Sequence, residues 1–148
     1  MAISLKGRNF FALEDFTPEE IRYLLDLAIQ LKKESREHIR HQDYIGEDFL
    51  LLFEMNSTRT RCAFETSAND LGMGTTFLSN SHFGNTETIK DSMRVFSEMY
   101  SAIGYRGAKH STLLEMAKDS RIPIINGYTD HQHPTQMLAD AMTLDEVW

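Results

Sequence analysis

Cysteine, long hydrophobic runs and positive charge are all scarce in this sequence. Of the 148 residues one is a cysteine, Cys62, so a disulfide within the chain is excluded. Neither Cys nor His stands beside it at the spacing of metal ligands, and we expect no metal site. No apolar stretch approaches the roughly 18 residues that a membrane span needs. The first residues, MAISLKGRNFF, lack the apolar core and the cleavage site of a secretory signal. We therefore expect a cytoplasmic protein without a membrane partner.

The charge balance excludes another class of partner. The sequence has 15 Lys and Arg against 22 Asp and Glu, which gives a net charge of −7. A general nucleic-acid binder needs a basic face, so we expect no nucleic-acid partner. A small anionic ligand is compatible with this balance only if arginines and amide donors gather locally.

Apolar runs and helical patterns alternate along the chain. Its length fits one domain, and we assign residues 1–148 to it. The apolar runs DFLLLFE, TTFLS, SAIGYRG and IPIING are separated by segments with helical periodicity. This alternation predicts an α/β fold: a parallel four-stranded sheet with helices on both faces, that is, a doubly wound fold.

The first and last helices of this pattern have clear signals. Thr17 is the expected N-cap of the first, with Pro18 at its first position and Glu20 completing a capping box. Its apolar residues follow helical spacing and predict a helix that packs on the core: Ile21, Leu24, Leu25, Ala28 and Leu31. The last helix opens at Pro134 and has apolar positions all around it, so we expect structure beyond residue 148 to cover it.

The segment STRTR, residues 57–61, lies where the first strand should turn into a helix. Three hydroxyls, two guanidinium groups and the free amides of a helix start form a combination that suits a phosphate. Structural interpretations also fit: Ser57 or Thr58 could cap the helix, and Arg61 could pair with Glu65 one turn later.

Three other segments fall at strand ends, where ligands sit in parallel α/β folds: 82–88, 106–107 and 126–136. Asn126 and Gly127 are expected to form the turn before the last helix. Arg106, His133 and Gln136 would then meet STRTR at one edge of the sheet. Arginines and amides for a phosphate, with His and Gln for a carbonyl and an amino group, describe a site for an anion that carries a carbonyl. No nucleophile stands beside a base, so covalent catalysis is not indicated.

The stretches FEMNSTRTRCAFE, ETIKDSMRVFSEMYSAIGYRG and INGYTDHQHPTQMLAD resemble, in order and spacing, the carbamoyl-phosphate domain of the aspartate and ornithine carbamoyltransferases, the ornithine branch more than the aspartate branch. The resemblance implies that carbamoyl phosphate is a substrate and that no cofactor or metal takes part. By resemblance, the phosphate is held by Ser57, Thr58, Arg59 and Thr60. Arg106, His133 and Gln136 are the implied catalytic residues, which also bind the carbamoyl end. In the family, ornithine attacks the carbamoyl carbon and citrulline and phosphate result.

The resemblance also implies a homotrimer, in which the loop around His82 reaches the site of a neighbouring subunit. The chain departs from the ornithine enzymes at Met55, His82 and Thr86, where they usually have Lys, Gln and Lys. The amino-acid-binding domain of the family, with its Asp-x-x-x-Ser-Met-Gly and His-Cys-Leu-Pro motifs, is absent from the 148 residues. We therefore expect little activity from the isolated domain. Two alternatives are a non-catalytic truncated paralogue that acts as a binding or assembly module, and a carbamoyltransferase with another amine acceptor.

Overall fold

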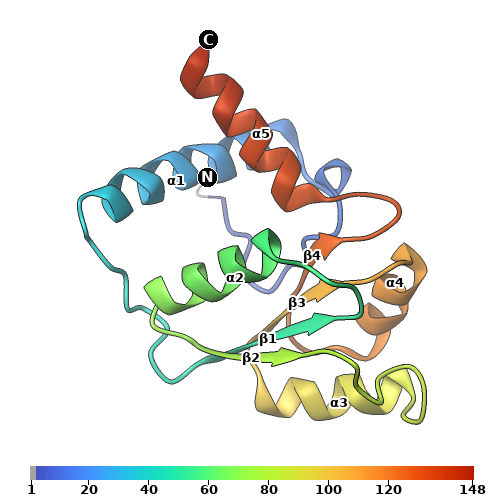
Figure 1. Ribbon diagram of the computed structural model, residues 1–148. Coiled ribbons are helices and arrows are strands. Elements are labelled where there is room, and N and C mark those ends of the chain that lie inside the picture. Colours follow the sequence, from blue (N-terminus) through green and yellow to red (C-terminus); the bar gives the residue numbers. More distant parts are fainter. Residues whose placement is uncertain (1–2) are drawn as a thin grey trace.

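The computed structural model describes residues 3–148, so the first two residues of the expected domain 1–148 lie outside it (Figure 1). Strands and helices alternate as the sequence predicts. The elements are η1 (Leu13–Asp15), α1 (Pro18–Arg36), β1 (Asp48–Phe53), α2 (Arg59–Asp70), β2 (Gly74–Leu78), α3 (Ile89–Met99), β3 (Ala102–Arg106), α4 (His110–Asp119), β4 (Ile124–Tyr128) and α5 (Pro134–Val147).

The sheet has four parallel strands in the order β2-β1-β3-β4. In the central strand β1, Leu51 lies opposite Phe77 of β2 on one side and Gly104 of β3 on the other. Five consecutive residues of β1 are buried. A continuous apolar strand is typical of a parallel sheet that is covered on both faces, and the predicted doubly wound α/β fold is confirmed.

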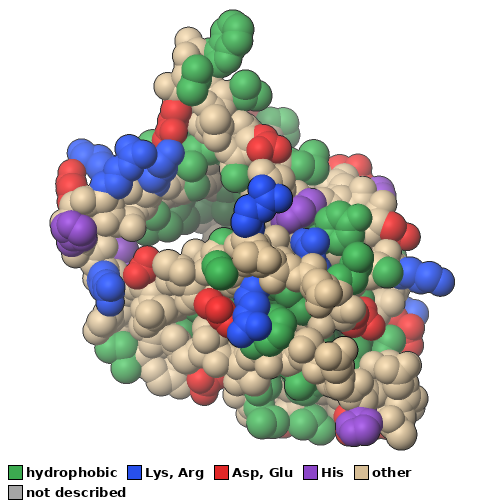
Figure 2. Space-filling model, in the orientation of Figure 1, with side chains coloured by type: hydrophobic (Ala, Val, Ile, Leu, Met, Phe, Trp, Pro, Cys, Tyr) green, Lys and Arg blue, Asp and Glu red, His purple; other side chains and the backbone are tan. Residues whose placement is uncertain are grey.

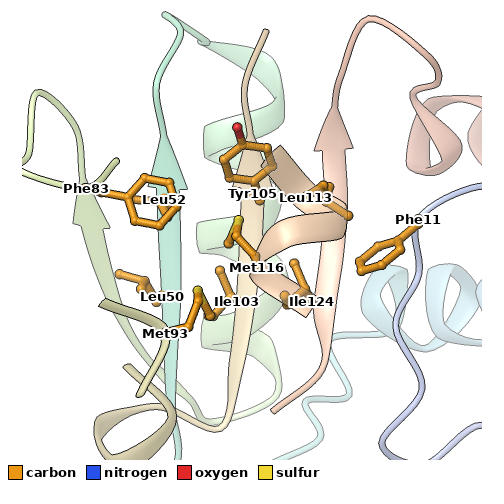
Figure 3. Packing of buried hydrophobic residues seen from close by; sticks show 10 residues of the cluster. All are labelled: Phe11, Leu50, Leu52, Phe83, Met93, Ile103, Tyr105, Leu113, Met116 and Ile124. Carbon is orange, nitrogen blue, oxygen red and sulfur yellow. The ribbon is translucent and has the colours of Figure 1, made fainter. Parts of the chain in front are cut away.

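Side chains alternate along β1 between two hydrophobic layers. Leu50 and Leu52 point toward α3 and α4, where they pack with Met93, Met116 and their neighbours (Figure 3). Leu51 belongs to the opposite layer, which lies under α2. The strand period of two residues therefore divides one apolar run between both faces of the sheet.

The order of the strands places a crevice at one sheet edge. The chain leaves β1 through α2 to reach β2, and it crosses back through α3 to pair β3 with the other side of β1. The connections after β1 and β3 therefore diverge. In open α/β sheets, ligands bind outside the carboxyl ends of the strands at such a reversal.

A segment near the N-terminus covers the outer edge of β4. The amide of Phe10 donates to the carbonyl of Ile124 over 2.9 Å, and the amide of Asn126 donates to the carbonyl of Phe10 over 2.8 Å. This pairing satisfies backbone groups that an open edge strand would expose.

Helix α1 begins as the sequence predicts but packs differently. The Thr17 and Glu20 capping box is present, with Pro18 at the start of the helix. The expected packing on the core is wrong, because none of the α1 residues, all of them within the described range, is buried. Its main neighbour is α5, which lies beside it in Figure 1 and contributes ion pairs to Arg22 and Lys32. The apolar face of α1 is thus only partly covered, chiefly by α5.

Helix α5 protrudes from the body and carries exposed apolar side chains toward its end (Figures 1 and 2). Met137 is 42% exposed, Leu144 60% and Val147 74%, while Leu138 is half-buried. The expected surplus of apolar positions on this helix is confirmed. Within residues 3–148, no helix is long and apolar enough to cross a membrane.

The two layers predict how the chain responds to truncation of leucines. Leu51→Ala should lower the free energy of unfolding by about 2–5 kcal/mol, because it leaves a cavity between α2 and the sheet. Leu144→Ala, the same change at an exposed position, should alter it by less than about 0.5 kcal/mol. Urea unfolding of both variants measures this difference, and equal effects would contradict the packing described.

Candidate functional site

Three of the four strand-end segments meet at one edge of the sheet. A guanidinium nitrogen of Arg106, at the end of β3, lies 3.5 Å from the hydroxyl of Thr60 at the start of α2. The same nitrogen donates to the carbonyl of Gly127 in β4 over 3.3 Å. The guanidinium carbon lies 4.7 Å from the centre of the Tyr128 ring, which contacts the ring of His133 edge-on. The structure therefore brings the ends of β1, β3 and β4 together around Arg106.

The turn after β1 presents free hydroxyl and amide groups. Thr58 occupies the N-cap position of α2, and the first-turn amides that follow it have no acceptor within the helix. Capping by the Thr58 side chain is wrong: within the described range its hydroxyl makes no capping hydrogen bond. The Ser57 hydroxyl likewise has no hydrogen-bond partner among residues 3–148, which leaves both groups available to a ligand.

The two arginines of STRTR have different environments. Arg61 donates to the Glu65 carboxylate over 3.0 Å, and its guanidinium carbon lies 3.6 Å from the centre of the Phe77 ring. The structural interpretation of Arg61 is therefore confirmed. Arg59 makes no hydrogen bond or ion pair with any residue that the structure describes, and it lines a hollow beside α2. Of the two guanidinium groups, that of Arg59 is the one available to an anion.

Arg106 has one donor without a partner. Its Nε atom is buried and finds no acceptor among the described residues. A buried, unpaired donor costs free energy, so a small shift of the Arg106 side chain that brought Nε to an acceptor oxygen of a ligand would be stabilising.

Gly107 and Gly127 make this close packing possible. Gly127 and the preceding Asn126 are buried residues of strand β4, so the expectation that these two residues form a turn is wrong. A Cβ atom at Gly127 would stand 2.9 Å from the Phe64 ring and 3.2 Å from the carbonyl oxygen of Tyr105. At Gly107 it would clash with the Tyr105 hydroxyl and the Glu54 carboxylate. Larger residues at either position would separate the elements that surround Arg106.

His133 and Gln136 lie at the start of α5. The Nδ1 atom of His133 is 3.1 Å from the Thr135 hydroxyl. Burial lowers the pKa of His133 below its ordinary value of 6.5, and the positive charge of Arg106 lowers it further. The imidazole is therefore neutral near pH 7. Gln136 is exposed, and its amide nitrogen donates to Asp140 over 2.9 Å, while its carbonyl oxygen accepts no hydrogen bond from residues 3–148.

A hollow of about 490 Å³ opens between α2, α5 and the sheet, and it is visible below α1 and α5 in Figure 2. Its polar lining consists of Arg59, Thr60, Ser67, His133, Thr135 and Gln136. Its apolar lining includes Phe49, Phe64, Leu71, Met73, Ala102 and Ile125. The polar groups of the site thus stand beside an apolar space.

The loop with His82 lies apart from these residues. Within the described chain, no hydrogen bond joins it to Arg106 or His133; instead the Nδ1 atom of His82 lies 2.8 Å from the Thr86 hydroxyl. Both residues are exposed, as is Met55. Two of the three departures from the ornithine enzymes therefore contact each other.

Two residues of the site were missed in the sequence. Tyr128 lies under the guanidinium of Arg106, and Thr135 contacts the ring of His133. Thr135 could have been predicted from the sequence, because it is part of the HPTQ motif. Tyr128 gave no signal beyond being an aromatic residue at a strand end. Among the residues described, no group of three or more His, Cys, Asp or Glu side chains is placed to hold a metal ion.

Comparisons with known proteins identify relatives of this chain. A family model described as aspartate/ornithine carbamoyltransferase, carbamoyl-P binding domain, matches residues 8–146. The catabolic ornithine carbamoyltransferase of Clostridium perfringens strain 13 is 51% identical over 146 residues, which cover 99% of this chain and 44% of that protein. The chain thus spans a little under half the length of this curated relative.

Solved structures show the same fold. The ornithine carbamoyltransferase of Pyrococcus furiosus has a TM-score of 0.95 at 36% identity, and the match covers 98% of this chain and 47% of that one. The aspartate transcarbamoylase of Trypanosoma cruzi has a TM-score of 0.88 at 24% identity, over 96% of this chain and 46% of that one. The second likeness shows a shared fold alone.

The position of His133 predicts how its titration responds to a neighbouring charge. Followed by NMR, His133 should titrate below its ordinary pKa of 6.5. Arg106→Gln removes a cation that disfavours the imidazolium, so the midpoint should rise. It should remain below the ordinary value, because burial is the larger cause and persists. Arg61→Gln, at an arginine already paired with Glu65, is the control and should leave the midpoint unchanged. A midpoint that does not move in Arg106→Gln would contradict the geometry.

Proposed function

Because the chain belongs to the aspartate/ornithine carbamoyltransferase family, as its carbamoyl-P binding domain, we propose that it binds carbamoyl phosphate where the ends of β1, β3 and β4 meet. The observation that supports this most strongly is the buried, unpaired Nε atom of Arg106, in a guanidinium group whose Nη1 atom lies 3.5 Å from the hydroxyl of Thr60. A phosphate or carbonyl oxygen would supply the acceptor that this donor lacks.

In this proposal the turn after β1 holds the phosphate. The first-turn amides and the helix dipole of α2 favour an anion, and the unengaged guanidinium of Arg59 adds a bidentate donor. The phosphate ligands are Ser57, Thr58, Arg59 and Thr60. The residues for the carbamoyl end are Arg106, His133 and Gln136.

The neutral state of His133 suits a role at the carbonyl oxygen. We assign the tautomer in which Nδ1 accepts from the Thr135 hydroxyl, so that Nε2–H is free to donate. The carbonyl oxygen of Gln136 would accept from the carbamoyl amino group. In the transfer, an amine forms a bond to the carbamoyl carbon, the bond from that carbon to the phosphate oxygen breaks, and the proton lost by the amine is taken up by the departing phosphate. Phosphate departs with the bonding electrons, and donors near the carbonyl and phosphate oxygens stabilise the developing charge.

The match covers 44% of the catabolic ornithine carbamoyltransferase, so the complete reaction and the assembly are separate proposals. We propose ornithine as the amine acceptor and a homotrimer as the assembly, in which the loop of His82 completes a neighbouring site. A cytoplasmic location remains a prediction. The 148 residues alone should bind carbamoyl phosphate and transfer little of its carbamoyl group, because orientation of both reactants is a large part of such catalysis.

The contrast between the two arginines of STRTR tests the proposed ligand. Arg59→Ala should weaken carbamoyl phosphate binding by about ten- to a hundredfold, because a charge-assisted hydrogen bond contributes about 1.5–3 kcal/mol. Arg61→Ala removes the same charge from the same turn but breaks an exposed ion pair, so the affinity should change by less than about threefold. Titration calorimetry measures both. Equal losses would point to net charge alone, and unchanged affinity in Arg59→Ala would refute this phosphate site.

A further inference from the structure

Asn126 is a fully buried polar residue in β4, directly before Gly127, whose carbonyl accepts from Arg106. Its Oδ1 atom accepts from the amide of Tyr128 over 3.0 Å. Its Nδ2 atom donates to the carbonyl of Phe11 over 2.8 Å and to the carbonyl of Gln132 over 3.2 Å, and it lies 3.4 Å from the Thr129 hydroxyl. Both ends of the amide are therefore used.

The carbonyl of Gln132, in the loop before α5, has several hydrogen-bond contacts. Besides Asn126, it accepts from the amide of Thr129 over 3.0 Å and lies 3.5 Å from the Thr129 hydroxyl. This carbonyl shares a rigid peptide plane with the amide of His133. Donors that fix the carbonyl therefore fix the point from which His133 begins.

The same loop is tied to the covering segment near the N-terminus. The side-chain oxygen of Gln132 accepts from the amide of Leu13 over 3.1 Å, while Asn126 holds the carbonyl of Phe11. A third link joins the Nε2 atom of His131 to the Glu14 carboxylate over 3.1 Å. Of these links, that of Asn126 joins the segment to the loop through a single side chain. An aspartate of the same shape would place an oxygen against two carbonyl oxygens.

We propose that Asn126 is a positioning residue that sets His133, and through it the carbamoyl subsite, without contacting the ligand. The inference rests on the proposed function, since it concerns the same site. It separates two parts of that site: within residues 3–148 no hydrogen bond joins the phosphate turn at α2 to the loop at 129–132, whereas His133 follows directly from that loop. Loss of the Asn126 amide should therefore affect the carbamoyl group and spare the phosphate.

The test compares two ligands, carbamoyl phosphate and inorganic phosphate, by titration calorimetry on the 148-residue chain. Asn126→Asp should weaken carbamoyl phosphate about tenfold, the effect of one misplaced hydrogen bond, and should change phosphate affinity by less than about twofold. Asn126→Ser, which is shorter and cannot span both carbonyls, should shift the ratio in the same direction and serves if the aspartate variant does not fold. Met93→Ala is the control: it loosens the core under α3, and the ratio of the two affinities should not change.

The outcomes distinguish the positioning role of Asn126 from the proposed binding of carbamoyl phosphate. The positioning role is supported if the affinity for carbamoyl phosphate, divided by that for inorganic phosphate, falls in both Asn126 variants and is unchanged in Met93→Ala. Equal losses for both ligands, or an unchanged ratio, would overturn it, because a merely structural residue affects both parts of the site alike. If the unmodified chain binds neither ligand, or does not prefer carbamoyl phosphate, the proposed function itself fails and this inference fails with it.

Discussion

The guanidinium group of Arg106 joins three chain segments that are distant in sequence, and the geometry of the site depends on it. It contacts Thr60 at the start of α2, the carbonyl of Gly127 in β4, and the ring of Tyr128. Its charge also lowers the pKa of His133. A single half-buried cation therefore links the loops at this edge and adds to the effect of burial, which is the larger cause of the lowered pKa of His133. The Nε atom of Arg106 has no hydrogen-bond acceptor among the described residues.

The fold supplies the space that this cation needs. Parallel strands end at the same edge, and the reversal between β1 and β3 separates the loops that follow them. Gly127 lets α2 approach β4, and Gly107 leaves room for Tyr105 and Glu54 beside Arg106. Asn126 then fixes the loop that leads to His133. Hydrogen bonds and close backbone packing thus hold the site together around Arg106, while Arg59 lines the adjacent hollow.

Local signals in the sequence were sufficient for the elements and for much of the site. The apolar run of β1 and the capping box at Thr17 each depend on neighbouring residues alone, and both predictions are confirmed. The burial of α1 depends on what lies opposite it, which periodicity does not report. Likewise, STRTR contains two arginines of equal chemistry, and only the positions of Glu65 and Phe77 distinguish Arg61 from its neighbour. Asn126 resembles a turn residue in sequence, whereas its partners at Phe11 and Gln132 are set by tertiary contacts.

A crystal structure of the chain with carbamoyl phosphate is the most direct test of the central claim, that an anion completes the environment of Arg106. The account predicts the phosphate at the first turn of α2, against Arg59 and Thr60, with a ligand oxygen about 2.9 Å from the Nε atom of Arg106. It also predicts the carbamoyl group toward His133. A ligand held in the apolar hollow or at the loop of His82, with the Nε atom of Arg106 still unpaired, would contradict it.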